Sequence, residues 1–348
     1  MSDNRNYGCG RTLAHPETIR GLARRAADHA GRGTALARKA ETALGRLARH
    51  LSQYGIRDLR RADREHVEAL CESWRAKCGQ GELSRAAVSG YLSALNGVFE
   101  ALGRDDLRVS LVAEGLHRGQ VHTNEDRSAT AAARDALISW LAYRAGIAHS
   151  REECLMLEAA GHAVRLQEAA GLRLRESGAL KVLEKELRGG CIALGRADGT
   201  KNGRPREARL YDPAALEVAR SFVRENRDVF ARGSLIPAGM TTRQWMDRMH
   251  HLLRQFREDT GVAHPGYHGH RHAYAQRLYA GLYEARRGVR VEPPVKEGRF
   301  GREHLASVAA RLGVSPARAR EIDREIRLEV SRNLGHGRVN ITRSYLGE

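Results

Sequence analysis

Residues 334–345 read LGHGRVNITRSY, which places Tyr345 nine residues after His336. Three more motifs precede this stretch, and all of them are rich in side chains that bind anions or move protons. They are GLRLRE at 171–176, TKNGRPR at 200–206 and HGHRH at 268–272.

Each motif has a plain structural explanation when it is taken alone. Arg173 and Glu176 have the spacing of a surface ion pair on one helical turn. Lys201 stands between Thr and Asn-Gly, which is typical of a solvated turn. A single tyrosine near the end of a sequence is usually a packing residue.

The histidine cluster raises the question of a metal. On a helix, His268 and His272 share a face and His270 does not. Two imidazoles can bind zinc, but no third ligand stands at a suitable spacing. We therefore expect no metal site.

Together, in this order and spacing, the motifs resemble those of the tyrosine recombinases. This family includes phage integrases, chromosome-dimer resolving recombinases and the integrases of integrative and conjugative elements. Its pattern is an arginine in GLRxxE, a lysine in a β-hairpin turn, H-x-x-R at the start of a helix, and LGH with a nucleophilic tyrosine nine residues later. The matching positions are Arg173, Glu176, Lys201, His268, Arg271, His336 and Tyr345.

The resemblance implies a DNA integrase that cuts and rejoins strands through a 3′-phosphotyrosyl link to Tyr345. Arg173 and Arg271 would clamp the phosphate, because guanidinium groups stay charged and bind phosphate oxygens in pairs. Lys201 would protonate the leaving 5′ oxygen. No cofactor is expected, since the covalent link keeps the phosphodiester energy and neither ATP nor metal is required.

The remaining site residues have supporting roles in this interpretation. An imidazole titrates in the useful range, so His268 is the expected base or proton carrier. His336 is expected to hydrogen-bond a phosphate oxygen. Glu176 is expected to orient Arg173 or His268 without touching DNA.

The sequence departs from the family pattern in two places. Gly269 stands where an acidic residue is common, and the segment between Arg271 and His336 is unusually long. The extra segment, about 287–320, contains VAARLGVSPARAREI, which is either a helix-turn-helix unit or simply two packed helices.

Only three residues follow Tyr345, too few for the tail that many relatives dock on a neighbouring subunit. We therefore expect the extra segment to reach the neighbour through Val308, Leu312 and Val314. The alternative is DNA binding through three arginines, Arg311, Arg318 and Arg320.

The charge predicts a polyanionic partner. Lys and Arg number 59 against 42 Asp and Glu, a formal net charge of +17. Such a surplus favours nucleic acid, because each neutralised phosphate releases a counterion. We expect double-stranded DNA carrying attachment sites as the partner, a tetramer on that DNA, and an accessory DNA-bending protein as an optional one.

The chain length and the residue pattern predict two domains and a mainly α fold with a small antiparallel β-sheet. We expect a basic arm at 1–30, a helical, SAM-like core-binding domain at 31–117, a linker at 118–128 and an α+β recombinase catalytic domain at 129–348. A hairpin is expected from strands at 191–194 and 207–211. Helices are expected at 34–54, after Asp63, from Ser84, and at 129–145, 151–170, 213–230, 242–260, 271–286, 304–312 and 316–334.

The remaining features are typical of a cytoplasmic protein, associated with the bacterial nucleoid when it is bound to DNA. Five scattered cysteines do not form a disulfide framework, and no apolar run is long enough to span a membrane. Two other functions stay open: a type IB topoisomerase, which shares the chemistry but acts as a monomer, and a non-catalytic regulator derived from an integrase.

Overall fold

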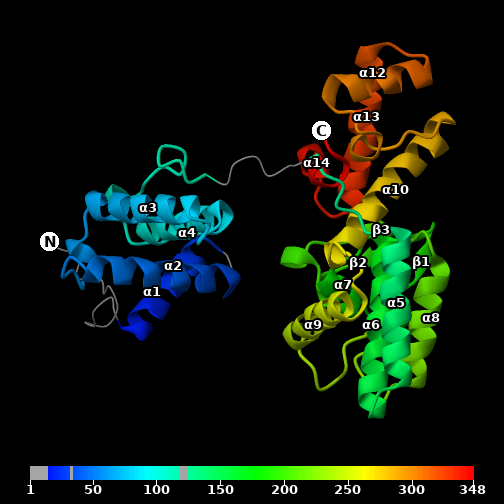
Figure 1. Cartoon of the computed structure of the whole chain (residues 1–348), viewed down its shortest axis with the longest axis horizontal. Helices are drawn as coiled ribbons and strands as arrows, with labels where there is room; N and C mark the ends of the chain where they lie inside the picture. Colours follow the sequence, from blue (N-terminus) through cyan, green and yellow to red (C-terminus); the bar gives the residue numbers. More distant parts are fainter. Residues whose placement is uncertain (1–14, 32–33, 118–123) are drawn as a thin grey trace. The chain divides into compact units, whose positions relative to one another are not determined.

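The structure is a computed structural model that describes residues 15–31, 34–117 and 124–348, without the side chains of residues 16, 34, 35 and 202. Its contacts divide the chain into two units, Met1–Val121 and His122–Glu348 (Figure 1). The first unit has its own buried core, as does the second. Within the described ranges, no helix is long and apolar enough to cross a membrane.

The first unit is a helical bundle. The Asp63 carboxylate accepts a hydrogen bond from the His66 amide, and the Ser84 hydroxyl accepts one from the Ala87 amide, so both predicted helix starts are confirmed. Two short 3-10 turns, Leu59–Arg61 and Asp105–Leu107, complete the bundle. Its helices are α1 (Pro16–His29), α2 (Thr34–Ser52), α3 (Arg64–Gly79) and α4 (Arg85–Ala101).

The bundle includes residues that we expected to lie in an arm. Residues 16–29 form α1, and Leu22, Ala23 and Ala26 on its inner face are buried in the same core as α2 and α4. Alanines at helical spacing supply this contact, and the arginines between them gave the segment its polar character. Residues 1–14 of the expected arm, and 118–123 of the expected linker, lie outside the described residues.

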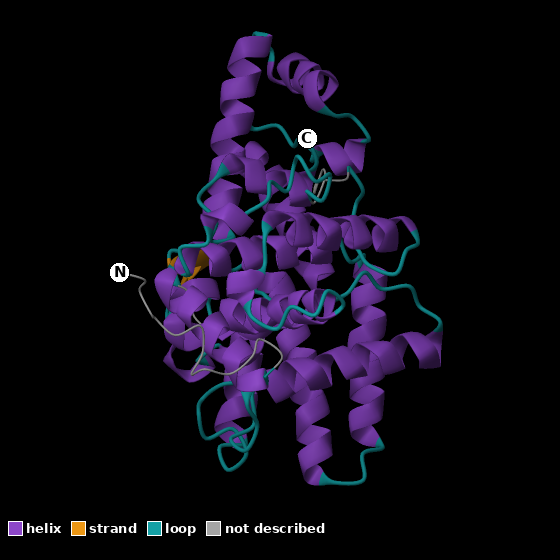
Figure 2. Cartoon of the chain, turned by 90° about the vertical axis from the view of Figure 1, so that its left-hand side faces the viewer, coloured by secondary structure: helices purple, strands orange, loops and turns teal. Residues whose placement is uncertain are grey.

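The second unit is also mainly helical, as predicted, and its strands form only a small patch among the helices (Figure 2). Helix α6 packs against α5, α8 and α10. The helices are α5 (Ala131–Gly146), α6 (Arg151–Ala170), α7 (Leu174–Ala179), α8 (Pro213–Glu225), α9 (Thr242–Thr260), α10 (Tyr267–Arg287), α11 (Pro294–Glu297), α12 (Gly301–Leu312), α13 (Pro316–Asn333) and α14 (Arg343–Leu346).

The small sheet is antiparallel, in the order β1 (Leu187–Arg188), β2 (Cys191–Leu194), β3 (Arg206–Arg209). The expected hairpin is the β2–β3 pair, in which Leu194 lies opposite Arg206. Strand β1 was not expected, because two residues are too short to show an alternating pattern. The mainly α fold with a small antiparallel sheet is thus confirmed.

Helix α10 joins two buried clusters of the second unit. Tyr267 lies in a cluster formed largely by α5, α6, α8 and α9. Tyr274, two turns further on, lies in a second cluster together with residues of α12, α13 and α14. The residues between them on α10, which include His268 and Arg271, are therefore held at the junction of two cores.

The extra segment forms α11, α12 and the first turns of α13. Two packed helices, α12 and α13, meet at Gly313, whose φ of +63° ends α12 in the left-handed conformation. Val308 is fully buried within its own unit, and Leu312 and Val314 pack against the same cluster. Val308 is therefore not available to a neighbouring subunit, because it fills this core. Leu312 and Val314 are only half-buried, and their contact with a neighbour stays a prediction. Arg311 forms an ion pair within the same unit, with 2.8 Å between its Nη2 and Oε1 of Glu297.

Candidate active site

The four motifs converge in the second unit. Arg173 precedes α7, and His268 and Arg271 lie in the first turns of α10. His336 follows α13, and Tyr345 lies on α14. Six of the seven predicted site residues are joined by the contacts described below; the seventh, Lys201, stands apart.

Glu176 is the centre of a buried cluster of arginines. Its Oε1 lies 2.5 Å from Nη1 of Arg173, and its Oε2 lies 2.7 Å from Nη2 of Arg206. Nη1 of Arg271 lies 4.0 Å from the same Oε2. Glu176 also accepts a hydrogen bond from the Arg173 amide at 2.9 Å. The predicted partnership with Arg173 is thus present.

The arginines keep Glu176 ionised in spite of its burial. Its side chain is fully buried, which by itself would raise the pKa. The charges of Arg206, Arg271 and Arg173 outweigh that cost and lower the pKa of Glu176 to about 2. One carboxylate thus offsets only part of three positive charges, so the cluster keeps a net positive charge that suits an anion.

Arg271 is fixed by backbone carbonyls on both sides of the site. Its guanidinium donates to the carbonyls of Gly171, at the end of α6, and Leu334, at the end of α13. Gly171 has a φ of +59°, and a Cβ there would lie 2.3 Å from the Tyr274 ring. The glycine of the GLRLRE motif is therefore required by both its conformation and its close packing.

The Tyr345 hydroxyl faces this cationic cluster. Arg271 Nε donates to it at 3.3 Å, and His336 Nε2 lies 3.5 Å from it. His336 Nε2 is also 3.5 Å from Nη2 of Arg173. Only 5% of Tyr345 is exposed. Arg271 and His336 are thus placed to stabilise the negative charge that develops on this oxygen when it attacks.

The histidines of α10 divide as helical geometry predicts. The rings of His268 and His272 lie 5.6 and 4.7 Å from the Tyr345 ring, centroid to centroid. The His270 ring lies instead 5.1 Å from that of His264. Burial, followed by the charges of Arg271 and Arg173, lowers the pKa of His268 and of His336 to about 4. Both imidazoles are thus neutral at pH 7.

Lys201 lies on the turn between β2 and β3, as predicted, in the short 3-10 turn Lys201–Gly203. Its side chain is exposed, and its charge is among those that lower the pKa of His336. So far as the described residues show, it makes none of the contacts that join the other six.

Two residues of the cluster were missed by the sequence interpretation. Arg206 pairs with Glu176 and is itself buried, and His272 packs on Tyr345. The signal for Arg206 was its alternation with Ala208, with which it shares the buried face of β3, and with Leu210 just beyond the strand. The signal for His272 was its helical spacing from His268.

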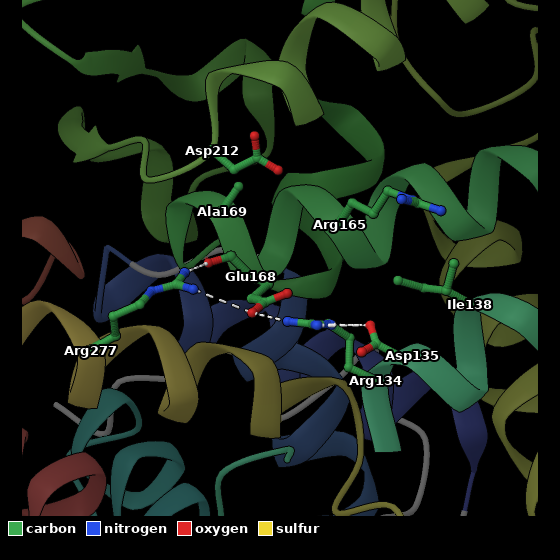
Figure 3. Close-up of a pocket in the computed structure, with 8 residues that line it drawn as sticks. All are labelled: Arg134, Asp135, Ile138, Arg165, Glu168, Ala169, Asp212 and Arg277. Atoms are coloured by element: carbon green, nitrogen blue, oxygen red, sulfur yellow. Dashed lines mark hydrogen bonds and ion pairs between the residues drawn. The ribbon is translucent and has the colours of Figure 1, made fainter. Parts of the chain in front are cut away.

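A second polar hollow in the same unit contains none of these residues. Arg134 and Arg277 both reach Glu168, and Arg134 also pairs with Asp135 (Figure 3). Its lining contains three arginines, which include Arg165, and three carboxylates, so its charges balance. Among the residues that the structure describes, no group of three or more His, Cys, Asp or Glu could hold a metal ion.

Acid should destabilise the second unit through its histidines. Burial lowers the pKa of His162, His268 and His272 to about 4 and that of His270 to about 3. In the unfolded chain the same histidines have pKa values near 6.5. Between about pH 6.5 and pH 4 the unfolded chain therefore binds more protons than the folded protein, and stability is lost as the pH falls through this window. We expect the thermal midpoint to fall steadily from about pH 7 to about pH 5.

The fluorescence of the two tryptophans of the second unit would report this midpoint in a Trp74→Phe background. A midpoint that stays constant down to about pH 4.5, where carboxylates begin to protonate, would contradict this expectation.

Comparison with known proteins agrees with this geometry. A family model described as Integrase matches residues 148–277, which contain Arg173, Lys201, His268 and Arg271. Among curated proteins, none matches the chain at a significant level.

Two solved structures share the fold. One is the XerH site-specific recombinase bound to a palindromic difH substrate in a post-cleavage complex, with a TM-score of 0.54 and 15% identity. The other is XerH bound to difH in a pre-cleavage complex, with a TM-score of 0.55 and 14% identity. Each alignment covers 95% of this chain and 80% of the other. The chain therefore contains an integrase segment and shares the fold of these two recombinase structures.

Proposed function

We propose that the chain is a site-specific DNA recombinase, an integrase that inserts or excises a mobile genetic element. The observation that carries this proposal is the position of the Tyr345 hydroxyl, which faces Arg271 and His336 at 3.3 and 3.5 Å beside the Arg173–Glu176 pair. A nucleophile, phosphate-binding cations and neutral imidazoles thus meet in one place. DNA is the partner supported by the net charge of +17 and by the DNA-bound XerH complexes of the same fold.

The proposed reaction is a transesterification. The Tyr345 oxygen attacks the scissile phosphorus, a bond forms between them, and the bond to the 5′ oxygen breaks. Arg173 and Arg271 stabilise the charge that grows on the non-bridging oxygens. The second strand's 5′ hydroxyl then attacks the phosphotyrosine, which restores a phosphodiester and frees the tyrosine.

The protons are assigned to three groups. His268, neutral at pH 7 and packed on Tyr345, accepts the proton of the attacking hydroxyl. A phosphate bound by the arginines would lie next to His336. We assign His336 to a hydrogen bond with a non-bridging oxygen of that phosphate. Lys201, exposed on its turn, protonates the leaving 5′ oxygen. Glu176 holds the arginines and touches no DNA.

The wider organisation follows from the same proposal. We infer that both units bind one duplex, that four subunits assemble on two duplexes for strand exchange, and that the reaction takes place in the cytoplasm, where bacterial DNA lies. The first unit is proposed as the core-binding domain and the second as the catalytic domain. An accessory DNA-bending protein would act on the DNA between binding sites.

A trapped-intermediate assay tests the function. The probes are nicked duplexes taken from the DNA that flanks the gene, so that cleavage releases a short strand and leaves the protein attached. We expect an SDS-stable adduct and, with two intact partner duplexes, joined products. Binding without any adduct would identify a non-catalytic regulator. Relaxation of supercoiled DNA without joining of partners would identify a topoisomerase.

The role of Lys201 can be tested through the leaving group. Lys201→Ala should cleave ordinary DNA roughly 10²–10⁴-fold more slowly, the usual contribution of a general acid. A substrate with a 5′-phosphorothiolate has a leaving sulfur that needs little protonation. This substrate should restore cleavage by Lys201→Ala and restore Arg173→Ala much less. Equal rescue of both variants would contradict the assignment.

A further inference from the structure

A network of buried polar side chains connects α10 to the extra segment. Asp323 on α13 is its centre, and its Oδ1 accepts hydrogen bonds from the hydroxyls of Tyr279 and Tyr283 on α10. His304 on α12 lies 3.0 Å from the Tyr279 hydroxyl. Arg327, one turn after Asp323, donates from Nε to Asp323 Oδ2 at 2.7 Å. All five residues are buried.

The network reaches the segment that bears the nucleophile. Nη1 of Arg327 donates to the carbonyl of Gly347 at 2.9 Å, two residues after Tyr345. A Cβ on Gly347 would lie 2.9 Å from Val295 and 3.2 Å from Phe300, so the extra segment packs closely against this backbone.

Helix α14 depends on such contacts from outside itself. It has four residues, Arg343–Leu346, and so forms barely one turn. An isolated turn is unstable, because fixing its dihedral angles costs more than its few hydrogen bonds return. Besides Arg327, the anchors include Gln276, which donates to the Tyr345 carbonyl at 3.2 Å, and the Gly301 amide, which donates to the Glu348 carbonyl at 3.1 Å. The Glu348 amide also donates to Asn124 Oδ1 at 3.1 Å.

We propose that Arg327 is a positioning residue, which places the Tyr345 hydroxyl for attack by anchoring the Gly347 carbonyl to α13. The proposal rests on the recombinase function proposed above. It also gives the extra segment a task within its own subunit, because His304 on α12 joins the polar network and Val295, Phe300 and Gly301 contact the backbone at 347–348.

The alternative is that Arg327 serves stability alone. It balances the buried charge of Asp323, so its loss would destabilise the unit whatever happens at Tyr345. Direct DNA contact is not an alternative, because Arg327 is buried. The two remaining roles differ in one measurable way: a positioning role slows the chemical step in molecules that are fully folded.

Two variants remove the anchor without leaving a buried charge unpaired. Arg327→Lys keeps a cation beside Asp323, but a single ammonium group lacks the fork that reaches Asp323 and Gly347 together. The double variant Asp323→Asn, Arg327→Met removes both charges. Val308→Ala is the matched control, since it weakens the same cluster from α12 without touching the Gly347 carbonyl.

The experiment measures single-turnover cleavage of the nicked duplex at saturating DNA, at a temperature well below the lowest midpoint of the variants. We expect both anchor variants to cleave about 10²-fold more slowly, the effect of a displacement near 1 Å. The DNA concentration that gives half saturation should be unchanged. The 5′-phosphorothiolate substrate should not restore cleavage by the two anchor variants. Val308→Ala should lose thermal stability and keep its cleavage rate.

The proposal is overturned if both anchor variants cleave at the wild-type rate. It is also overturned if the cleavage rate of all three variants falls in proportion to thermal stability, which would be a purely structural effect. Failure of the proposed function would look different, because the wild-type protein itself would then form no adduct.

Discussion

Tyr345→Phe is expected to bind DNA as tightly as the wild-type protein and to form no covalent adduct at all. The substitution removes only the hydroxyl, and the ring keeps its packing against His268 and His272. The hydrogen bond lost from Arg271 is long, at 3.3 Å, so the cost in stability should be about 1 kcal/mol or less. Fluorescence anisotropy of labelled duplex gives the affinity, and an SDS gel gives the adduct.

Tyr274→Phe serves as a control for this experiment. Tyr274 lies on the same helix as Arg271, but its hydroxyl donates to the Arg209 carbonyl at 2.8 Å and burial raises its pKa. It should therefore form the adduct normally. An SDS-stable adduct with Tyr345→Phe would mean that another tyrosine attacks, and Tyr274 and Tyr283 would be the first to test.

Glu176→Gln is expected to cause the largest loss of stability among single substitutions in the site. The amide keeps the shape of the side chain but leaves Arg173, Arg206 and Arg271 close together without a counter-charge. Breaking a buried ion pair in this way typically costs about 3–5 kcal/mol. Denaturant unfolding of the second unit measures the loss, and single-turnover cleavage should also fall, by about 10²-fold, because both phosphate-binding arginines lose their support.

Two comparisons show whether charge is the cause. Glu176→Asp keeps the carboxylate and should lose less stability than Glu176→Gln. Added sulfate should stabilise Glu176→Gln more than the wild type, because an anion can then bind among the arginines. If the free energy of unfolding of Glu176→Gln lies within about 1 kcal/mol of the wild-type value, the arginines do not depend on this carboxylate.

Much of the fold and the site could be predicted because the signals are local. Asp63 and Ser84 start helices through hydrogen bonds to residues three positions away, so the sequence alone reveals them. Arg173 and Glu176 lie on one turn, and the face shared by His268 and His272 follows from helical geometry. These local relations account for the confirmed helices and for the contacts within each motif.

The features that could not be predicted depend on contacts between distant residues. Arg206 pairs with Glu176 from a position 30 residues away, and nothing in its neighbourhood identifies that partner. In the extra segment, Val308 is apolar whether it fills its own core or docks on another subunit, and only the structure decides between the two. The alanine-rich face of α1 was similarly hidden among arginines.

The central claim is that Tyr345 becomes linked to DNA, and peptide mapping of the trapped adduct tests it most directly. The adduct is digested with nuclease and protease, and mass spectrometry locates the residual nucleotide. We predict a single modified peptide that carries a nucleotide 3′-phosphate on Tyr345. A nucleotide on any other residue, or a 5′-phosphate link, would contradict the account.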